Sequence, residues 1–116
     1  MARTTLEIIH QHSENLIGKN LEAVMADFAQ DAVMISPQGV LKGYDALRAN
    51  FEGTIKNLLT PDAKAEILLE KAEGKIGYCI WKLESDHVSI PFASDTFVVE
   101  NDKIVAQTFA AVVKKK

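Results

Sequence analysis

Asp95 is an acidic residue inside the largely apolar segment 87–99, and a carboxyl group in such surroundings could take part in acid–base chemistry. Because side chains alternate between the two faces of a strand, Asp95 shares its face with Ala93 and Phe97. A carboxyl group on a buried apolar face has its pKa raised by desolvation, and its protonated form donates a hydrogen bond at neutral pH. The sequence also allows Asp95 to be solvated at a strand edge or paired with Lys82.

The other reactive side chains form no recognisable catalytic or metal-binding motif. His10 and His12 are two positions apart and point to different faces of a helix, so they do not form a metal pair. Cys79 is the single cysteine, which excludes an intrachain disulfide and a cysteine-based metal site. Phosphate-binding loops, dinucleotide fingerprints and nucleophile elbows have no counterpart in the sequence. We therefore expect neither a cofactor nor a metal, and an inert buried thiol at Cys79.

The composition is that of one globular domain over residues 1–116, with 47% hydrophobic and 25% charged residues. Thirteen Lys and Arg against sixteen Asp and Glu give a net charge of −3, and without the three terminal lysines the balance is ten against sixteen, or −6. An acidic body disfavours nucleic-acid binding. No uncharged stretch is long enough to span a membrane and no secretory signal is recognisable, so we expect no membrane contact and a cytoplasmic location.

Three segments have the apolar spacing and the end signals of helices. These segments are residues 5–18, 21–28 and 44–59. Thr4 and Glu7 have the spacing of a capping box before the first helix, and Asn20 is a suitable cap for the second. Phe51 belongs to the apolar stripe of the third. A short strand over residues 32–35 separates the second helix from the third.

From residue 63 onward the apolar pattern changes to a period of two, which predicts strands. The predicted strands are residues 64–73, 75–84, 87–100 and 103–113. Their connections are short turns, so the strands should form an antiparallel meander. The chain is thus predicted to be an α+β domain with three N-terminal helices packed on one face of a curved antiparallel sheet. A curved sheet covered in this way forms a cone with an open mouth, where we expect a pocket.

Residues 20–37 (NLEAVMADFAQDAVMISP) and 41–48 (LKGYDALR) resemble the opening of an NTF2-like domain of the SnoaL-like type, also described as cystatin-like. Residues 94–104 (SDTFVVENDKI) resemble the final strand pair of that family. The resemblance covers residues 6–112 and is one of order and spacing. It implies the cone-shaped fold. Family members include ketosteroid isomerases, polyketide cyclases, dehydratases, epoxide hydrolases and domains that only dimerise or bind partners, so it implies the fold more than the function.

The resemblance to the ketosteroid isomerases also implies candidate catalytic residues. Those enzymes place a carboxylate base before a Pro at the end of the first strand, a hydrogen-bonding Tyr on the first helix, and a protonated Asp followed two residues later by an aromatic. At the position of the base this chain has Ser36, which precedes Pro37, and at the position of the Tyr it has His12. At the position of the protonated Asp it has Asp95, followed two residues later by Phe97. A Ser hydroxyl cannot abstract a proton next to a carbonyl unless a partner takes its own proton, so steroid isomerase chemistry by the family's mechanism is disfavoured.

Strand alternation extends the expected pocket over the neighbouring strands. The expected substrate-binding residues are Phe51 from the third helix and Tyr78, Ile80, Lys82, Phe97, Gln107 and Phe109 from the strands. The opposite face then carries Trp81 and Phe92 and is too apolar to face water, which predicts a homodimer through the outer face of the sheet. A change of register by one residue would exchange the two faces.

Three functions remain open from the sequence. The first is a cofactor-independent isomerase, cyclase or dehydratase for a small lipophilic carbonyl compound, in which Asp95 and His12 polarise an oxygen and His12 or water moves the proton. The second is a non-catalytic module that holds a small hydrophobic molecule, which the absence of a base at Ser36 favours. The third is a dimerisation domain that acts through the outer face around Trp81 and Phe92.

Overall fold

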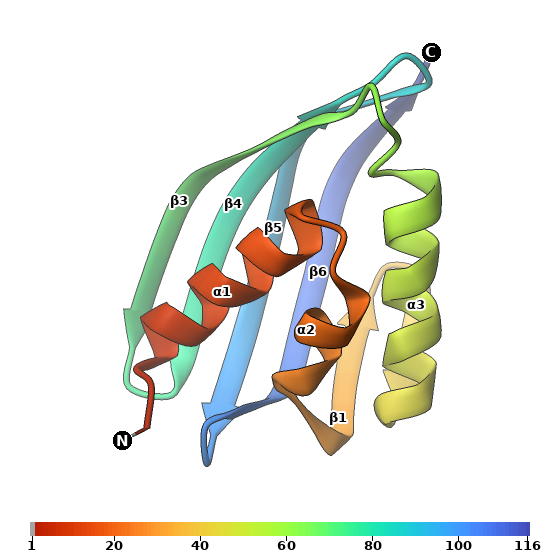
Figure 1. Cartoon of the computed structure of the whole chain (residues 1–116). Coiled ribbons are helices and arrows are strands. Elements are labelled where there is room, and N and C mark those ends of the chain that lie inside the picture. The colour runs from red at the N-terminus through yellow and green to blue at the C-terminus, as the bar shows by residue number, and fades with distance from the viewer. Residues whose placement is uncertain (1) are drawn as a thin grey trace.

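The computed structural model describes residues 2–116 and contains three helices and one six-stranded sheet (Figure 1). The elements in chain order are α1 (Thr5–Ile17), α2 (Leu21–Ala26), β1 (Phe28–Ser36), β2 (Gly39–Lys42), α3 (Tyr44–Asn57), β3 (Lys64–Glu73), β4 (Ile76–Glu84), β5 (Val88–Glu100) and β6 (Lys103–Lys115). The predicted elements are all present. The largest difference lies at the start of the sheet, where α2 ends at Ala26 and β1 begins at Phe28.

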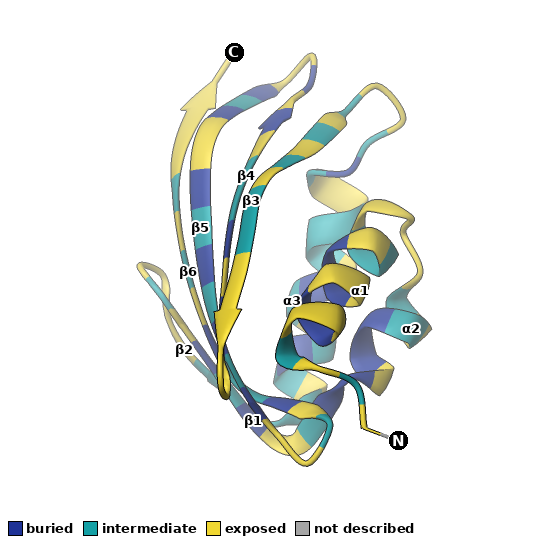
Figure 2. Ribbon diagram, turned by 90° about the vertical axis from the view of Figure 1, so that its left-hand side faces the viewer, coloured by how far each residue is buried: buried dark blue, intermediate teal, exposed yellow. Residues whose placement is uncertain are grey.

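The strands form one sheet in the order β2-β1-β6-β5-β4-β3. Strands β3 to β6 form the predicted antiparallel meander. The sheet is not antiparallel throughout, because β1 pairs with β6 in parallel. The helices are also not consecutive, since α3 follows the β1–β2 hairpin. All three helices lie on the concave face of the curved sheet, which confirms the predicted α+β, NTF2-like architecture (Figure 2).

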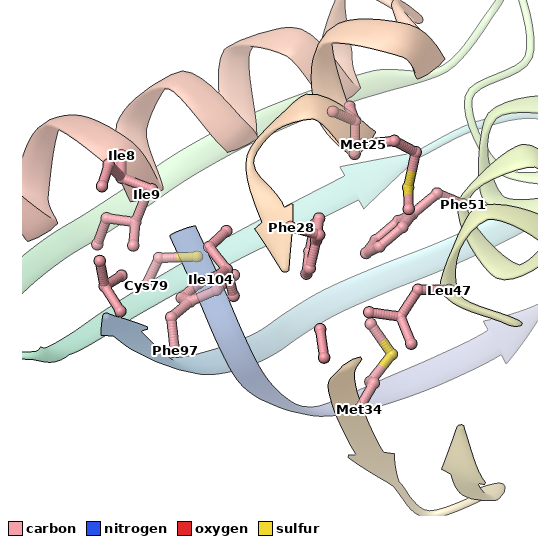
Figure 3. Packing of buried hydrophobic residues seen from close by; sticks show 13 residues of the cluster. Ile8, Ile9, Met25, Phe28, Met34, Leu47, Phe51, Cys79, Phe97 and Ile104 are labelled. Carbon is pink, nitrogen blue, oxygen red and sulfur yellow. The ribbon is translucent and has the colours of Figure 1, made fainter. Parts of the chain in front are cut away.

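The main hydrophobic core lies between the helices and the concave face of the sheet (Figure 3). Its buried members are Ile8, Ile9, Val24, Met25, Phe28, Ala32, Met34, Leu47, Phe51, Cys79, Phe97, Val99 and Ile104. A second buried cluster lies on the same face at the other end of β4 and β5 and consists of Leu59, Leu83, Val88, Ile90 and Ala93. The space between these two clusters is where the candidate site is found.

Helix α1 is fixed at its start and along its length. The N–H of Glu7 donates to Oγ1 of Thr4 at 3.1 Å, and the N–H of Thr4 donates to Oε1 of Glu7 at 2.8 Å, which confirms the capping box. The helix packs closely on β4 at Gly77, where a Cβ atom would lie 2.8 Å from Cγ2 of Ile9. Among residues 2–116, no helix has the length and apolar character needed to cross a membrane.

A β-bulge in β5 decides which side chains of β4 face the helices. Trp81 of β4 pairs with Ala93 of β5, and Leu83 pairs with Ile90. The step from Trp81 to Leu83 is two residues, whereas the step from Ala93 back to Ile90 is three, so β5 contains one extra residue. The extra residue lies next to Pro91. Proline has no N–H to donate to the ladder, so within a sheet it occurs at edges and bulges, and β5 is a central strand. The bulge therefore accommodates Pro91 and shifts the register by one residue.

Candidate functional site

Asp95 lies on the concave face of β5 and is held by hydrogen bonds from both neighbouring strands. Its side chain is buried, and the residue is 7% exposed. Nε1–H of Trp81 on β4 donates to Oδ1 at 3.3 Å, and Nε2–H of Gln107 on β6 donates to Oδ2 at 3.0 Å. Each carboxylate oxygen thus has its own donor, and the plane of the carboxylate is fixed from both sides.

Burial sets the protonation behaviour of this carboxyl group. Desolvation raises the pKa of Asp95 to about 6, against the opposing effect of the hydrogen bonds from Trp81 and Gln107, which favour the charged form. The carboxyl group is therefore mostly ionised at neutral pH and accepts hydrogen bonds rather than donating one. A pKa close to the working pH is suited to a group that takes up and releases a proton.

Asp95 lies where two hollows of unequal size meet. The larger has a volume of about 420 Å³ and opens beside the β1–β2 hairpin. Its lining residues are Leu16, Met34, Ser36, Gln38, Gly39, Val40, Leu41, Asn50, Phe51, Thr54, Leu58, Trp81, Ile90, Asp95, Gln107, Phe109 and Val113. The smaller has a volume of about 60 Å³ and lies between α1, the end of α3 and strands β3 and β4. Asp95 and Trp81 line both, so a bound molecule that fills the two hollows passes the carboxylate.

His12 is placed on the inner side of α1 in an aromatic enclosure. Its ring makes edge contacts with Phe28, Phe51 and Phe97 at centroid distances of 5.5, 5.5 and 5.2 Å. Desolvation lowers the pKa of His12 to about 4, so the imidazole is neutral at physiological pH. His12 lines the smaller hollow, and its Nδ1 is buried without a hydrogen-bond partner among residues 2–116. No hydrogen bond joins it to Asp95 within that part of the chain.

The remaining expected site residues on the concave face fall into two groups. Ser36 lies at the rim of the larger hollow, where its hydroxyl donates to Oε1 of Gln38 at 3.0 Å. Phe51, Gln107 and Phe109 line the same hollow. Phe97 is completely buried and lines neither hollow. It packs against the ring of His12 in the core.

Three expected pocket residues lie on the opposite face of the sheet. Tyr78, Ile80 and Lys82 were predicted on the face of Asp95, and this placement is wrong because Cys79 pairs with Asp95 in the ladder. Counting back from the turn at residues 85 and 86 without the bulge puts Tyr78 opposite Asp95. The additional residue of the bulge moves β4 by one position and exchanges its two faces.

The same shift brings Trp81 into the site. The prediction that Trp81 lies on the outer face with Phe92 is wrong: its indole stacks on Phe109, with ring centroids 6.0 Å apart and an interplanar angle of 14°, and hydrogen-bonds Asp95. Asn50 and Thr54 of α3 also line the larger hollow, and the sequence analysis did not single them out. Pro91 within a central strand was the sequence signal for the bulge. The bulge in turn places Trp81 on the same face as Asp95.

Cys79 and the acidic residues offer no second reactive centre. Burial raises the pKa of the Cys79 thiol to about 12, so it stays protonated and unreactive, as the sequence predicted for a buried thiol. Among residues 2–116, no group of three or more His, Cys, Asp and Glu side chains is arranged to hold a metal ion. Among residues 2–116, the candidate reactive groups of the concave face are therefore Asp95 and the polar groups around the two hollows.

A curved sheet covered by helices on its concave face is the architecture of NTF2-like proteins. The chain belongs to the SnoaL-like domain family, whose model matches residues 9–107. This match confirms the family resemblance of the sequence. No curated protein matches the chain.

Solved structures with the same fold include proteins assigned to different activities. An NTF2-like protein of unknown function from Cytophaga hutchinsonii has a TM-score of 0.79 and 16% identity over 97% of this chain and 93% of its own. A protein from Kribbella flavida, provisionally assigned as a ketosteroid isomerase, has a TM-score of 0.79 and 14% identity over 93% of this chain and 77% of its own. A provisionally assigned polyketide cyclase from Sinorhizobium meliloti has a TM-score of 0.74 and 17% identity, covering 89% and 93%. At these identities the likeness concerns the fold alone.

Proposed function

We propose that this SnoaL-like protein is a cofactor-independent enzyme that moves a proton on a small lipophilic carbonyl compound, as an isomerase, a cyclase or a dehydratase does. The observation that carries the proposal is the Asp95 carboxylate, buried where two hollows with mainly apolar walls meet. Apolar walls with a few converging polar groups suit a lipophilic ligand that presents one reactive centre. The provisional assignments of the Kribbella flavida and Sinorhizobium meliloti proteins lend support to this class of reaction.

In the proposed reaction the ionised Asp95 takes a proton from the carbon next to the carbonyl. The electron pair of that C–H bond moves towards the carbonyl oxygen and forms an enolate. In an isomerisation, Asp95 returns the proton to a different carbon. In a cyclisation, the enolate carbon forms a bond to a second carbonyl carbon, the π electrons of that C–O bond move to its oxygen, and this oxygen takes the proton from Asp95. In a dehydration, the enolate expels a β-hydroxyl group, which leaves as water with the proton from Asp95. Each route balances without an oxidant or a reductant.

The groups around Asp95 have distinct proposed roles. Trp81 and Gln107 position the carboxylate, because each donates to one of its oxygens. Asn50 is the proposed donor to the developing oxyanion, since its Nδ2 points to Sδ of Met34 at 3.8 Å, a weak acceptor that a carbonyl oxygen can replace. His12 is neutral, and its burial favours a role in polarising the ligand over a role as the proton carrier. Ser36 at the rim has no proposed part in proton transfer.

The test is hydrogen–deuterium exchange of a simple ketone in D₂O. Butyrophenone is suitable because its α-carbon carries exchangeable hydrogens and both substituents are apolar. The wild-type protein is expected to raise the rate of exchange at the α-carbon, followed by NMR, above the rate in buffer. Saturable binding without accelerated exchange would favour the second candidate, a non-catalytic ligand-binding module, which Ser36 at the family's base position supports. A protein that neither binds the ketone nor accelerates exchange would contradict the proposal.

We also propose that two copies of the chain associate through the outer face of the sheet, with Phe92 rather than Trp81 at the contact. Phe92 pairs with Val112, and the two side chains are 46% and 48% exposed. Tyr78 adds a third exposed apolar side chain on β4. Between them lie small residues, Ser94 and Ala110, which pair with one another and leave room for a second sheet. A face that carries exposed apolar side chains with small residues between them is suited to a self-complementary interface.

Sedimentation equilibrium tests this association. The wild type is expected at twice the 12.8 kDa of the single chain, and Phe92→Glu is expected to sediment as the monomer because it places a charge in an apolar contact. Leu68→Glu is the control, since Leu68 is equally exposed but lies on the edge strand β3. A monomeric wild type at tens of micromolar would contradict the proposal. The cytoplasmic location and the absence of a nucleic-acid partner stay predictions.

A further inference from the structure

The smaller hollow is a separate compartment beside the reactive carboxylate. Its walls come from four elements besides β5, and the lining residues are His12, Ser13, Leu16, Ile17, Thr54, Leu58, Leu59, Ala65, Ile67, Cys79, Trp81, Leu83 and Asp95. Leu16, Thr54 and Leu58 also line the larger hollow, together with Trp81 and Asp95. The two compartments therefore adjoin at Asp95, and only one of them is large enough for the body of a ligand.

Apart from Nδ1 of His12, which is buried without a partner among residues 2–116, the polar atoms of Asp95 and Thr54 in the smaller hollow are already hydrogen-bonded. Oδ1 and Oδ2 of Asp95 each accept a hydrogen bond from the protein, and Oγ1 of Thr54 donates to the carbonyl of Asn50 at 3.1 Å. His12 is neutral and surrounded by phenylalanine rings. Nearly all the rest of the wall is aliphatic or aromatic carbon. A hollow with such walls binds an alkyl group more favourably than a polar one.

We infer that the smaller hollow is a specificity subsite that takes a short alkyl arm attached to the carbon at which Asp95 acts. The inference rests on the proposed function and adds a substrate class to it: carbonyl compounds that carry a bulky lipophilic part on one side of the reacting carbon and a short unbranched alkyl arm on the other. An apolar cavity of about 150 Å³ holds one benzene molecule, so a volume of about 60 Å³ corresponds to an arm of about two to three carbons.

A series of phenyl ketones measures this length directly. Propiophenone, butyrophenone, valerophenone and heptanophenone share the phenyl carbonyl group and differ in the arm beyond the α-carbon, which has one, two, three and five carbons. The dissociation constant should fall about fourfold for each methylene group up to valerophenone, because each is transferred from water into an apolar site. Heptanophenone should bind more weakly than valerophenone, because its arm exceeds the hollow.

Ala65 supplies the matched variant. Ala65 pairs with Leu83 across β3 and β4, so both side chains point into the smaller hollow. Ala65→Leu fills the hollow and is expected to abolish the preference for valerophenone, while the affinity for propiophenone falls by no more than about fourfold, the contribution of its one-carbon arm. Ala65→Val, a smaller change, should shorten the preferred arm by about one carbon. Ala72→Leu is the control, because Ala72 lies on the same strand but is exposed and lines neither hollow.

A hydroxyl-ended arm distinguishes the alkyl subsite from a polar one. The compound 4-hydroxybutyrophenone replaces the terminal methyl of valerophenone with a hydroxyl. This hydroxyl could donate a hydrogen bond to Nδ1 of His12, which has no partner among residues 2–116. We expect valerophenone to bind at least tenfold more tightly; tighter binding of the hydroxyl compound would overturn the inference. A flat length profile, with exchange that still depends on Asp95, would overturn the subsite and leave the proposed function. Absence of binding by every ketone would overturn both.

Discussion

Asp95→Asn is expected to slow proton abstraction from a bound ketone at least 100-fold while the dissociation constant changes by less than about fivefold, because a positioned general base contributes 10² or more to the rate. The substitution preserves shape and hydrogen bonding. The amide oxygen of Asn can accept from Nε1 of Trp81. Its NH₂ can donate to Oε1 of Gln107, which is buried without a partner among the described residues, once the Gln107 amide turns over. The loss would therefore report on the charge and basicity of the carboxylate rather than on the structure of the site.

Asp31→Asn is the control for this experiment. Asp31 lies on β1, is exposed and lines neither hollow, so the same chemical change there should leave the exchange rate unaltered. The rate constant per bound ketone is measured by NMR in D₂O, and binding is measured separately by titration. Unchanged exchange in Asp95→Asn would remove Asp95 from the reaction and direct attention to the non-catalytic alternative.

The same substitution is expected to stabilise the protein above neutral pH. The pKa of Asp95 is raised by burial to about 6 from 3.8, so the native state holds its proton more tightly than the unfolded chain. The contribution of this group to stability is complete below pH 4 and is lost as the pH rises through 6, which amounts to about 3 kcal/mol. Asp95→Asn cannot ionise and does not undergo this loss. Its free energy of unfolding should exceed that of the wild type by up to about 3 kcal/mol at pH 8 and by little at pH 4.

His12 gives the wild type an opposite pH dependence. Its pKa is lowered to about 4 from 6.5, so its contribution to stability is complete above pH 6.5 and is lost as the pH falls through 4. Between pH 4 and 6.5 the ionisation of Asp95 lowers the free energy of unfolding as the pH rises, and the deprotonation of His12 raises it. In Asp95→Asn only the effect of His12 remains, so the variant should lose stability as the pH falls through 4. Urea unfolding at several pH values measures both curves. A difference between the two proteins that is the same at pH 4 and pH 8 would contradict the assignment of the raised pKa to Asp95.

The gain in stability and the loss of activity have one physical origin. The buried charge of Asp95 is unfavourable for folding because the apolar surroundings desolvate it, and the same surroundings give it the basicity that proton abstraction needs. Natural proteins accept such local destabilisation at sites where a reaction requires it. A variant that is more stable and inactive would therefore support a catalytic role, whereas a merely structural carboxylate should lose stability when its charge is removed.

Local signals predicted the elements of the fold well. The capping pair Thr4 and Glu7 marked the start of α1, and period-two alternation marked the four strands of the meander. The parallel pairing of β1 with β6 could not be predicted in the same way, because it joins segments far apart in the chain. Register between such segments depends on the packing of the whole sheet.

The site was predicted in part. The face of β6 and the face of β5 from Ala93 onward were predicted correctly, so Gln107 and Phe109 lie with Asp95 at the larger hollow, whereas Ile90 before the bulge was assigned to the wrong face. The face of β4 was predicted wrongly, because strand alternation was carried across a bulge that Pro91 indicates. Trp81 was consequently assigned to the wrong side of the sheet. A pocket in the cone was expected, but its division into two hollows could not be predicted, since it depends on how α1 and the end of α3 lie over the sheet.

The most direct test of the account is the pH dependence of ketone exchange by the wild-type protein. If the ionised Asp95 abstracts the proton, kcat/KM for α-carbon exchange rises through a single ionisation near pH 6 and is constant above about pH 7. Exchange that falls as the pH rises through 6 would mean that the protonated carboxyl acts as an acid or a hydrogen-bond donor. Exchange no faster than in buffer at any pH would contradict the central claim that this site moves protons.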